Sequence, residues 1–221
     1  MSRISAIVVA AGKGKRFGSS KQFVLLKGKP VLDHCLERLE AHKDISEIIL
    51  VLRDKKFERR YLEYYRKISA IAKGGRKRQN SVISGFNRID QKNTDIVLVH
   101  DGVRPLITED LLDRVIDAAQ KKGAAVPVIP VEDTLKLVRG KDVLRTVAKK
   151  GLFRVQTPQG FSCDVLKKAL DKAIEDDYYG TDEAVLVERT GIEICAVEGD
   201  PRNIKVTTPD DIIIAEAFLE D

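Results

Sequence analysis

The sequence predicts an α/β fold, in which a doubly wound, mostly parallel sheet carries a protruding β-hairpin arm. Short continuous apolar runs, typical of strands buried on both faces, alternate with helical patterns along most of the 221 residues. The alternation breaks off once, at residues 130–156, where two alternating segments flank the turn-like residues 139–142. We therefore expect one domain over residues 1–221, from which an arm at about 130–156 projects.

The first half of the chain is expected to alternate strand and helix. The predicted strands are 4–9, 48–52, 69–72 and 96–99, and the predicted helices are 30–39, 54–65 and 79–89. Pro30 suits the first position of its helix, and Leu32, Leu36 and Leu39 then lie on one face. Asp54 is a suitable N-cap for the second helix.

The second half begins with a capped helix, because Thr108 precedes two acids that favour the positive end of a helix dipole. A strand at 124–128, hairpin strands at 134–138 and 143–147, helices at 164–174 and 181–190, and a strand at 193–197 follow. Residues 203–207 are interpreted as a further alternating strand. Thr208 and Pro209 predict the cap and first position of a last helix.

Composition excludes several classes of protein. No apolar run approaches the ~20 residues that cross a bilayer, and the N-terminus lacks a signal-peptide pattern, so we expect a cytoplasmic protein without a membrane partner. Three widely spaced cysteines indicate buried thiols rather than a disulfide framework or a zinc site. The net charge of +5 suits nucleic acid or a polyphosphate, but one loop concentrates the cations, which favours the polyphosphate.

That loop spans residues 10–22 and combines three glycines with four cations. Glycines let the backbone approach a phosphate closely, and the clustered cations repel one another unless an anion lies between them. A dinucleotide-binding fingerprint would need glycine where the chain has Phe17, and a P-loop would need lysine directly after Gly18. The loop therefore favours a triphosphate bound in another way, with a solvated basic turn as the alternative.

Two further segments follow predicted strands. Gly74 and Gly75 open a helix whose first turns hold Ser81, a combination suited to backbone contact with a base or ribose, or to an ordinary basic loop. Asp101 directly follows a buried strand, where a carboxylate beside a polyphosphate is well placed to bind Mg²⁺ or, alternatively, to cap the next turn. His100 is expected to be a core residue rather than a catalyst.

The segments occur in an order that resembles one known family. The chain contains A-A-G-K-G-K-R with Lys21, G-G with Ser81, H-D-x-x-R-P, V-E-D-T, T-P-Q, T-D-E-A and N-I-K-V-T. Over nearly its whole length it is similar to the 2-C-methyl-D-erythritol 4-phosphate cytidylyltransferase family of the non-mevalonate isoprenoid pathway. The resemblance implies a Rossmann-like nucleotidyltransferase fold, Mg²⁺ dependence, the substrates CTP and a small polyol phosphate, and a homodimer formed through the arm.

The resemblance also implies roles for individual residues. The family's catalytic cations match Arg16, Lys21 and Lys205, and its metal carboxylate matches Asp101. Its nucleotide-binding positions match Ala10, Ala11, Gly12, Gly14, Gly75 and Ser81, and its substrate-binding positions match Arg104, Thr134, Lys149 and Thr157. Thr134 and Lys149 would act in the partner's site. Lys149 departs from the arginine common there, which keeps the charge but loses a bidentate contact with phosphate.

Three other functions remain open at this point. A ribitol 5-phosphate cytidylyltransferase has similar loops and acts on a similar substrate. A non-catalytic nucleotide-binding regulator would need fewer aligned cations than this chain has. A nucleic-acid-binding module would need base-stacking aromatic residues, for which the sequence shows no stripe.

Overall fold

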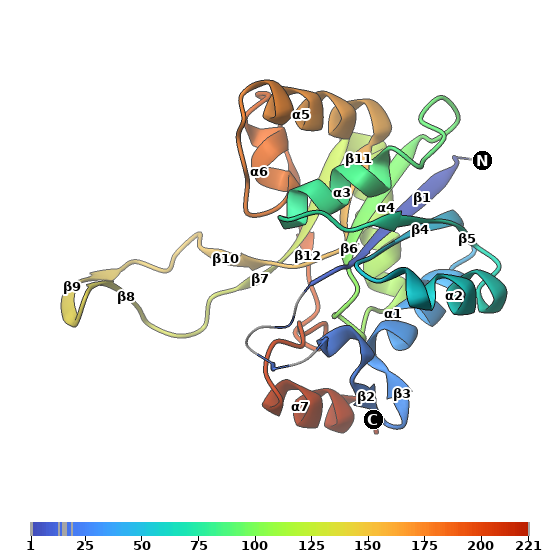
Figure 1. Ribbon diagram of the computed structural model, residues 1–221. Coiled ribbons are helices and arrows are strands. Elements are labelled where there is room, and N and C mark those ends of the chain that lie inside the picture. The colour runs from blue at the N-terminus through green and yellow to red at the C-terminus, as the bar shows by residue number, and fades with distance from the viewer. Residues whose placement is uncertain (1, 13, 15–16, 19, 221) are drawn as a thin grey trace.

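Within the described residues, the main sheet has eight strands, and Figure 1 shows how they are arranged. The computed structural model describes residues 2–12, 14, 17–18 and 20–220. The strands are β1 (Ile4–Ala10), β4 (Ile45–Leu52), β5 (Ile68–Lys73), β6 (Ile96–Asp101), β7 (Ala124–Pro130), β10 (Phe153–Val155), β11 (Gln159–Ser162) and β12 (Cys195–Glu198). Neighbouring strands β5, β4, β1 and β6 are parallel, as is the β7–β12 pair. The predicted mostly parallel sheet is confirmed.

Helices cover both faces of this sheet, because successive side chains of a strand point to opposite faces. Ile4, Ala6 and Val8 of β1 pack in one core with α1 (Val31–Ala41), α2 (Glu58–Tyr64) and α4 (Glu109–Lys122). Ile7 packs in a second core with α3 (Arg78–Phe86), α5 (Cys163–Glu175) and α6 (Glu183–Glu188). The two sets of helices lie on opposite sides of the sheet in Figure 1, so the doubly wound arrangement is also confirmed.

Strand β11 is the main feature that the sequence analysis missed. It pairs antiparallel with both β6 and β7 and so lies inside the sheet. With only four residues, of which Gly160 is one, it lacks the apolar run by which the other inner strands were found. A Cβ on Gly160 would lie 2.8 Å from Val115 of α4, so close packing of this helix requires glycine.

The arm consists of β8 (Leu135–Arg139) and β9 (Asp142–Val147), which pair only with each other and extend away from the body in Figure 1. Both ends of the predicted 130–156 segment belong to the main sheet instead. Phe153 of β10 pairs with Pro130 of β7, so residues 131–152 form the part outside the sheet. Leu137, Val138, Val143 and Leu144 expose their side chains on this arm.

A third, small core joins residues from three parts of the chain, near positions 26–31, 103–106 and 206–215. The short strands β2 (Leu25–Leu26) and β3 (Lys29–Pro30) pair with each other, and Leu26 packs against Val103, Val206 and Ala215 of α7 (Asp210–Phe218). The backbone N–H of Val206 donates to the carbonyl of Val103 (2.9 Å). This contact brings the 203–207 segment beside the end of β6.

Several predicted boundaries were wrong for local reasons. Residues 203–207 form no strand, since they are held by the third core rather than by a neighbouring strand. The 54–65 segment begins as a short 3-10 helix, η2 (Lys55–Phe57), which Asp54 caps by accepting from the N–H of Lys56 (3.0 Å). The helix predicted at 181–190 is shorter and forms α6 (Glu183–Glu188). The strand predicted at 193–197 begins two residues later and forms β12 (Cys195–Glu198).

The starts of the later helices follow the sequence more closely. The hydroxyl of Thr108 accepts from the N–H of Leu111 (3.3 Å), as predicted for the start of α4. Helix α7 instead begins at Asp210, and the Thr208 side chain does not cap it. The carboxylate of Asp211, inside the helix, accepts from the preceding N–H groups of Thr207 (2.7 Å) and Thr208 (2.8 Å). Among the described residues, no helix is both long and apolar enough to cross a bilayer.

Candidate active site

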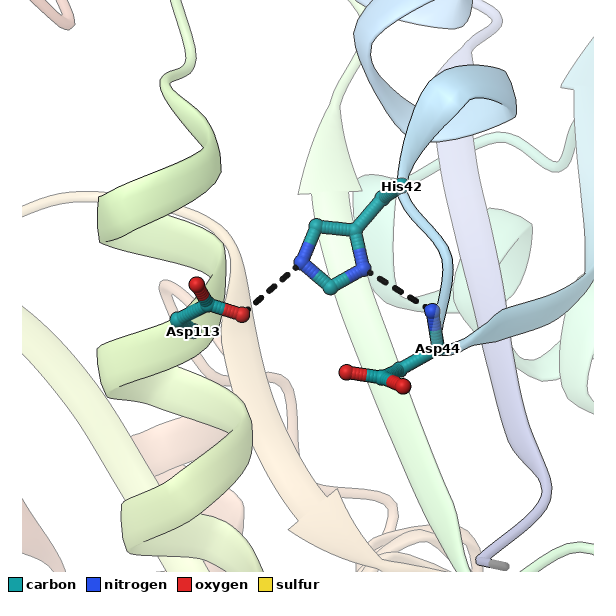
Figure 2. A group of neighbouring side chains, drawn as sticks. All are labelled: His42, Asp44 and Asp113. Carbon is teal, nitrogen blue, oxygen red and sulfur yellow. Dashed lines mark hydrogen bonds and ion pairs between the residues drawn. The ribbon is translucent and has the colours of Figure 1, made fainter.

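Charged side chains that could bind a metal gather at opposite ends of the sheet. At the amino end, His42 follows α1, Asp44 precedes β4, and Asp113 lies on α4 (Figure 2). In the described part of the chain these three form the one group of at least three metal-binding side chains within reach of a single ion. Sequence reasoning did not identify this cluster, because its members lie on separate elements.

The hydrogen bonds of His42 favour a structural role for this amino-end cluster. Nδ1 accepts from the backbone N–H of Asp44 (3.4 Å), so the ring proton is on Nε2, which donates to Asp113 (3.1 Å). A metal on Nε2 would have to displace that proton and break the contact with Asp113. The cluster therefore ties the end of α1 to α4.

At the carboxyl end, the loops after β1, β5 and β6 meet around a cavity of about 280 Å³. Ligands of open α/β sheets bind at this edge, where parallel strands end together. Of the residues predicted from the sequence, Ala10, Ala11, Gly12, Lys21, Gly75, Ser81, Asp101 and Lys205 line the cavity. Gly14 does not line it; its carbonyl accepts from the N–H of Phe17 (2.9 Å). Arg16 lies outside the described residues.

The wall formed by Gly75 and Ser81 has a fixed shape. The N–H of Gly75 donates to the Ser81 hydroxyl (3.0 Å), and that hydroxyl lies 3.4 Å from the carbonyl of Lys77, to which it donates. A Cβ on Gly75 would lie 2.3 Å from the Cβ of Asn80, so only glycine allows the chain to turn this closely onto the start of α3. The two residues expected to bind the nucleoside thus position each other.

Lys21 and Lys205 reach the cavity from segments far apart in sequence. Nζ of Lys21 donates to the carbonyl of Val206 (2.7 Å), and Nζ of Lys205 contacts Oδ2 of Asp101 (2.6 Å). The third core makes this possible, because it packs Val206 beside the end of β6. Both lysines therefore line the cavity that Asp101 also lines.

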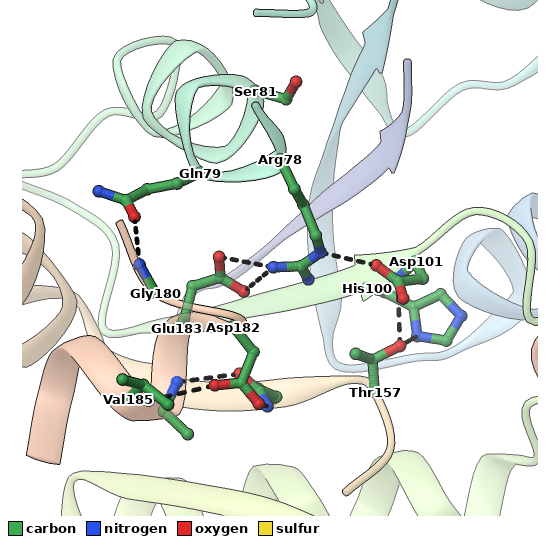
Figure 3. A network of polar contacts seen from close by, with 12 residues as sticks. Arg78, Gln79, Ser81, His100, Asp101, Thr157, Gly180, Asp182, Glu183 and Val185 are labelled. Atoms are coloured by element: carbon green, nitrogen blue, oxygen red, sulfur yellow. Dashed lines mark hydrogen bonds and ion pairs between the residues drawn. The ribbon is translucent and has the colours of Figure 1, made fainter. Parts of the chain in front are cut away.

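A chain of buried charges extends from this carboxylate (Figure 3). Nε of Arg78 donates to Oδ1 of Asp101 (3.0 Å), and Nη1 of Arg78 donates to both oxygens of Glu183 (2.7 and 2.6 Å). Burial disfavours the charged form of Asp101, but Arg78 and Lys205 more than offset it and hold the pKa of Asp101 well below its ordinary value. Burial raises the pKa of Glu183, and Arg78 offsets this only in part.

Arg78 and Glu183 were not among the site residues predicted from the sequence. Both lie within segments that carry predicted site residues or family motifs, the basic loop after Gly75 and the T-D-E-A motif. A buried position for the glutamate, which α6 brings against the start of α3, was the missing information. The carboxylate of Asp101 is thus ionised, nearly inaccessible, and already engaged on both oxygens.

His100 lies beneath this network and is fully buried, as expected. Burial lowers its pKa to about 4, so the ring is neutral at pH 7. Its Nε2 lies 3.3 Å from the carbonyl of Arg104 and must donate, which leaves Nδ1 to accept from the hydroxyl of Thr157 (3.1 Å). The same hydroxyl accepts from the backbone N–H of Asp101 (3.1 Å). His100 and Thr157 therefore fix the backbone that carries the carboxylate.

Arg104 is a further cation, and it lies close to the first cavity without lining it. It is nearly buried, and burial lowers its pKa. Nη1 donates to the carbonyl of Asn203 (2.7 Å). Within the described ranges, Nε has no hydrogen-bond partner and no carboxylate forms an ion pair with Arg104. Arg104 lines two further cavities, of about 180 and 270 Å³, and the smaller one shares Arg78, Asp101 and Lys205 with the first.

This arrangement leaves room for an anion on each side of Asp101. A buried, incompletely paired guanidinium is unfavourable unless a ligand completes its contacts. One carboxylate whose pKa is lowered by its cationic partners, set beside a cavity lined by cations, also matches how Mg²⁺ is usually held, by one or two carboxylates together with phosphate oxygens. Thr134 and Lys149 lie on the exposed arm and line none of the three cavities.

Known proteins are similar to this chain along its full length. The sequence profile of the family described as 2-C-methyl-D-erythritol 4-phosphate cytidylyltransferase matches residues 4–221. A protein of that name from Syntrophus aciditrophicus (strain SB) is 47% identical over 226 residues, which cover 99% of this chain and 96% of the relative. One from Alkaliphilus metalliredigens (strain QYMF) is 42% identical, covering 99% and 93%.

Solved structures agree. The 4-diphosphocytidyl-2C-methyl-D-erythritol synthase of Anaerococcus prevotii has a TM-score of 0.87 at 32% identity, covering 100% of this chain and 97% of its own. The 2-C-methyl-D-erythritol 4-phosphate cytidylyltransferase of Thermus thermophilus has a TM-score of 0.83 at 33% identity, covering 99% and 100%. Both likenesses therefore extend over nearly the whole chain.

Proposed function

The chain belongs to the 2-C-methyl-D-erythritol 4-phosphate cytidylyltransferase family, and from this premise we propose how its carboxyl-end residues perform the reaction. The enzyme transfers a cytidylyl group from CTP to 2-C-methyl-D-erythritol 4-phosphate and releases pyrophosphate, in isoprenoid precursor biosynthesis. The observation that supports the proposed site best is the position of Asp101, ionised and set between two cation-lined cavities.

We assign CTP to the larger cavity. Gly75 and Ser81 would contact the nucleoside, while the backbone of residues 10–14 and the cations Arg16 and Lys21 would surround the triphosphate. Lys21 is well suited to this role, because Val206 holds its ammonium group beside the cavity. Its charge would have the greatest effect where negative charge builds on the α-phosphate in the transition state.

We assign the polyol phosphate to the smaller cavities on the other side of Asp101. Arg104 lacks a carboxylate partner among the described residues there and would pair with the phosphate, with Lys205 between the two substrates. Thr157 would contribute mainly through the backbone of Asp101, since its hydroxyl is already engaged. Thr134 and Lys149 of the partner subunit would complete the site, which is the function we propose for the arm in a homodimer.

The nucleophile needs no general base. A phosphate monoester has a second pKa of about 6, so the attacking oxygen is already largely unprotonated at neutral pH. His100 is not available as a base, because both of its ring nitrogens are hydrogen-bonded beneath the site. Catalysis then depends on positioning the two anions and neutralising their charge, which Arg16, Lys21 and Lys205 would do.

Enzymes that transfer nucleotidyl groups generally depend on a divalent metal ion, and we propose Mg²⁺ for this one, held by Asp101 and phosphate oxygens. The metal would supply positive charge to the triphosphate. The ionised state of Asp101 suits this role, since no proton has to leave before the metal binds. Small phosphorylated substrates also fit a cytoplasmic enzyme that has neither a nucleic-acid nor a membrane partner.

Release of pyrophosphate tests the proposal directly. We expect release with CTP and 2-C-methyl-D-erythritol 4-phosphate in the presence of Mg²⁺, and little with ATP, GTP or UTP. Ribitol 5-phosphate serves as the competing acceptor, and faster release with it would overturn the acceptor assignment. Tight CTP binding without any release would instead indicate a nucleotide-binding regulator.

A further inference from the structure

Arg78 is held from two sides at the boundary between the proposed CTP and polyol phosphate sites. Glu183 accepts both hydrogen bonds from Nη1, and Asp101 accepts one from Nε (Figure 3). The remaining nitrogen, Nη2, is buried without a hydrogen-bond partner in the described part of the chain. Arg78 lines the cavities on both sides of Asp101, so this residue belongs to the wall that they share.

Glu183 belongs to a segment that grips the start of α3 at successive residues. Nε2 of Gln79 donates to the carbonyl of Tyr178 (3.0 Å), and the N–H of Gly180 donates to Oε1 of Gln79 (3.0 Å). The ammonium group of Lys77 lies 3.1 Å from the ring centroid of Tyr179. Residues 178–183 therefore fix the loop that precedes α3, and Glu183, with 1% of its side chain exposed, contributes a carboxylate to this contact.

Asp101 has more partners than oxygens once a metal is included. Its two oxygens face Arg78 and Lys205, so a metal ion that binds there must displace a cation or share an oxygen with it. Of these two cations, Arg78 also pairs with a second carboxylate, Glu183, and can keep that pair when it leaves Asp101. Without Glu183, Asp101 would be the only carboxylate partner of a largely buried guanidinium within the described ranges, and their mutual attraction would increase.

We propose that Glu183 is a positioning residue, which holds Arg78 at the wall between the two substrate sites and allows Asp101 to exchange Arg78 for a divalent metal ion. This inference rests on the proposed function, because it takes Asp101 as the metal carboxylate. It also gives the Nε–H of Arg78 a role, because this group would no longer donate to Asp101 and would be available to a substrate phosphate.

The first experiment compares Glu183→Gln, Glu183→Asp and Glu188→Gln with the parent enzyme. Glu188→Gln is the matched control, because it makes the same change at an exposed position on the same helix. We expect Glu183→Gln to raise the Mg²⁺ concentration for half-maximal pyrophosphate release about 10-fold, because removing a residue that supports a metal ligand commonly weakens metal binding by this factor or more. Glu183→Asp, which keeps the charge, should recover part of that loss, and Glu188→Gln should match the parent.

A second readout does not depend on turnover. CTP binding is measured by calorimetry without the second substrate, at increasing Mg²⁺, for the same four proteins. The inference predicts the same shift in Mg²⁺ dependence for Glu183→Gln. If the parent releases pyrophosphate and Glu183→Gln has the parent's Mg²⁺ dependence in both assays, the positioning role is wrong. A parent that binds CTP but releases no pyrophosphate refutes the proposed function instead.

A double-mutant cycle with Arg78→Gln separates action through Arg78 from the loss of one nearby charge. If Glu183 acts through Arg78, adding Glu183→Gln to Arg78→Gln changes the Mg²⁺ dependence no further. A full shift of about 10-fold in that background would overturn the inference. Circular dichroism checks folding, and if Glu183→Gln is unfolded, the decision moves to Glu183→Asp, for which a Mg²⁺ dependence equal to the parent's contradicts the role.

Discussion

The two ends of the sheet each contain a buried histidine with both ring nitrogens hydrogen-bonded, yet their surroundings differ. At the amino end, His42 donates to Asp113, whose side chain is 51% exposed, and little charge is removed from water. At the carboxyl end, His100 supports Asp101, whose side chain is 8% exposed and pairs with two cations. One end binds two helices together, while the other concentrates charge in the interior.

This difference indicates which end is functional. Buried charges have lost much of their hydration, and even well-paired ones contribute little net stability, so a protein that keeps them usually has another use for them. The amino-end cluster has the ligand types of a metal site, but its three residues line none of the cavities around Asp101. Cations that converge on one ionised carboxylate are therefore a better sign of this chemistry than three metal-binding side chains close together.

Two lysines that both donate to a backbone carbonyl give the sharpest test of this comparison. Lys21 contacts the carbonyl of Val206 beside the proposed active-site cavity, and Lys67 contacts the carbonyl of His42 at the other end (2.6 Å). We expect Lys21→Ala to lower kcat by about 10²-fold or more, on the scale of losing one preorganised charge contact. Steady-state kinetics should show a parental kcat for Lys67→Ala, and a parental kcat for Lys21→Ala would remove it from catalysis.

His100 should make stability depend on pH. Its pKa is lowered to about 4 in the folded protein, against about 6.5 in the unfolded chain, so between these values the unfolded state binds more protons. Stability therefore falls as the pH drops through this window, by about 2 kcal/mol between pH 7 and pH 5. Well below pH 4, where His100 is protonated in both states, no further loss comes from this group.

Urea unfolding of the parent and of His100→Asn at pH 7 and pH 5 measures the contribution of His100 to the pH dependence of the free energy of unfolding. We expect the variant to be less stable at pH 7 but to lose about 2 kcal/mol less on acidification. Glu183 works in the opposite direction, because its pKa is raised, and comparison with the variant cancels that contribution. Equal losses in both proteins would show that His100 is not the titrating group.

The sequence predicted the sheet and most of the carboxyl-end site because both depend on local patterns. Apolar runs located β1, β4 and β6. The segments at and after the ends of β1, β5 and β6 contain residues that line the proposed CTP cavity, namely Lys21, Gly75, Ser81 and Asp101. Arg78 and Glu183 escaped because their pairing depends on how α6 packs against α3 across 105 positions of the chain. Strand β11 was missed because it has only four residues, one of which is Gly160, and therefore no apolar run of its own.

Replacing one carboxylate at each end tests the metal assignment. Asp101→Asn keeps the shape of the side chain but removes the charge, so we expect the Mg²⁺ concentration for half-maximal pyrophosphate release to rise about 10-fold or more. Asp113→Asn makes the same change in the amino-end cluster and should leave the Mg²⁺ titration unchanged. A titration of Asp101→Asn that superimposes on the parent's would exclude Asp101 from the metal site.

The smallest effect is expected where the amino-end cluster itself is broken. His42→Phe keeps a ring in the buried space but removes the donor to Asp113 and the acceptor for Asp44, so unfolding should require about 1 kcal/mol less. Because this end lies opposite the active site, kcat at saturating Mg²⁺ should not change. A large fall in kcat would show that the two ends are coupled, and a Zn²⁺-induced rise in Tm that His42→Phe abolishes would show that the cluster binds metal after all.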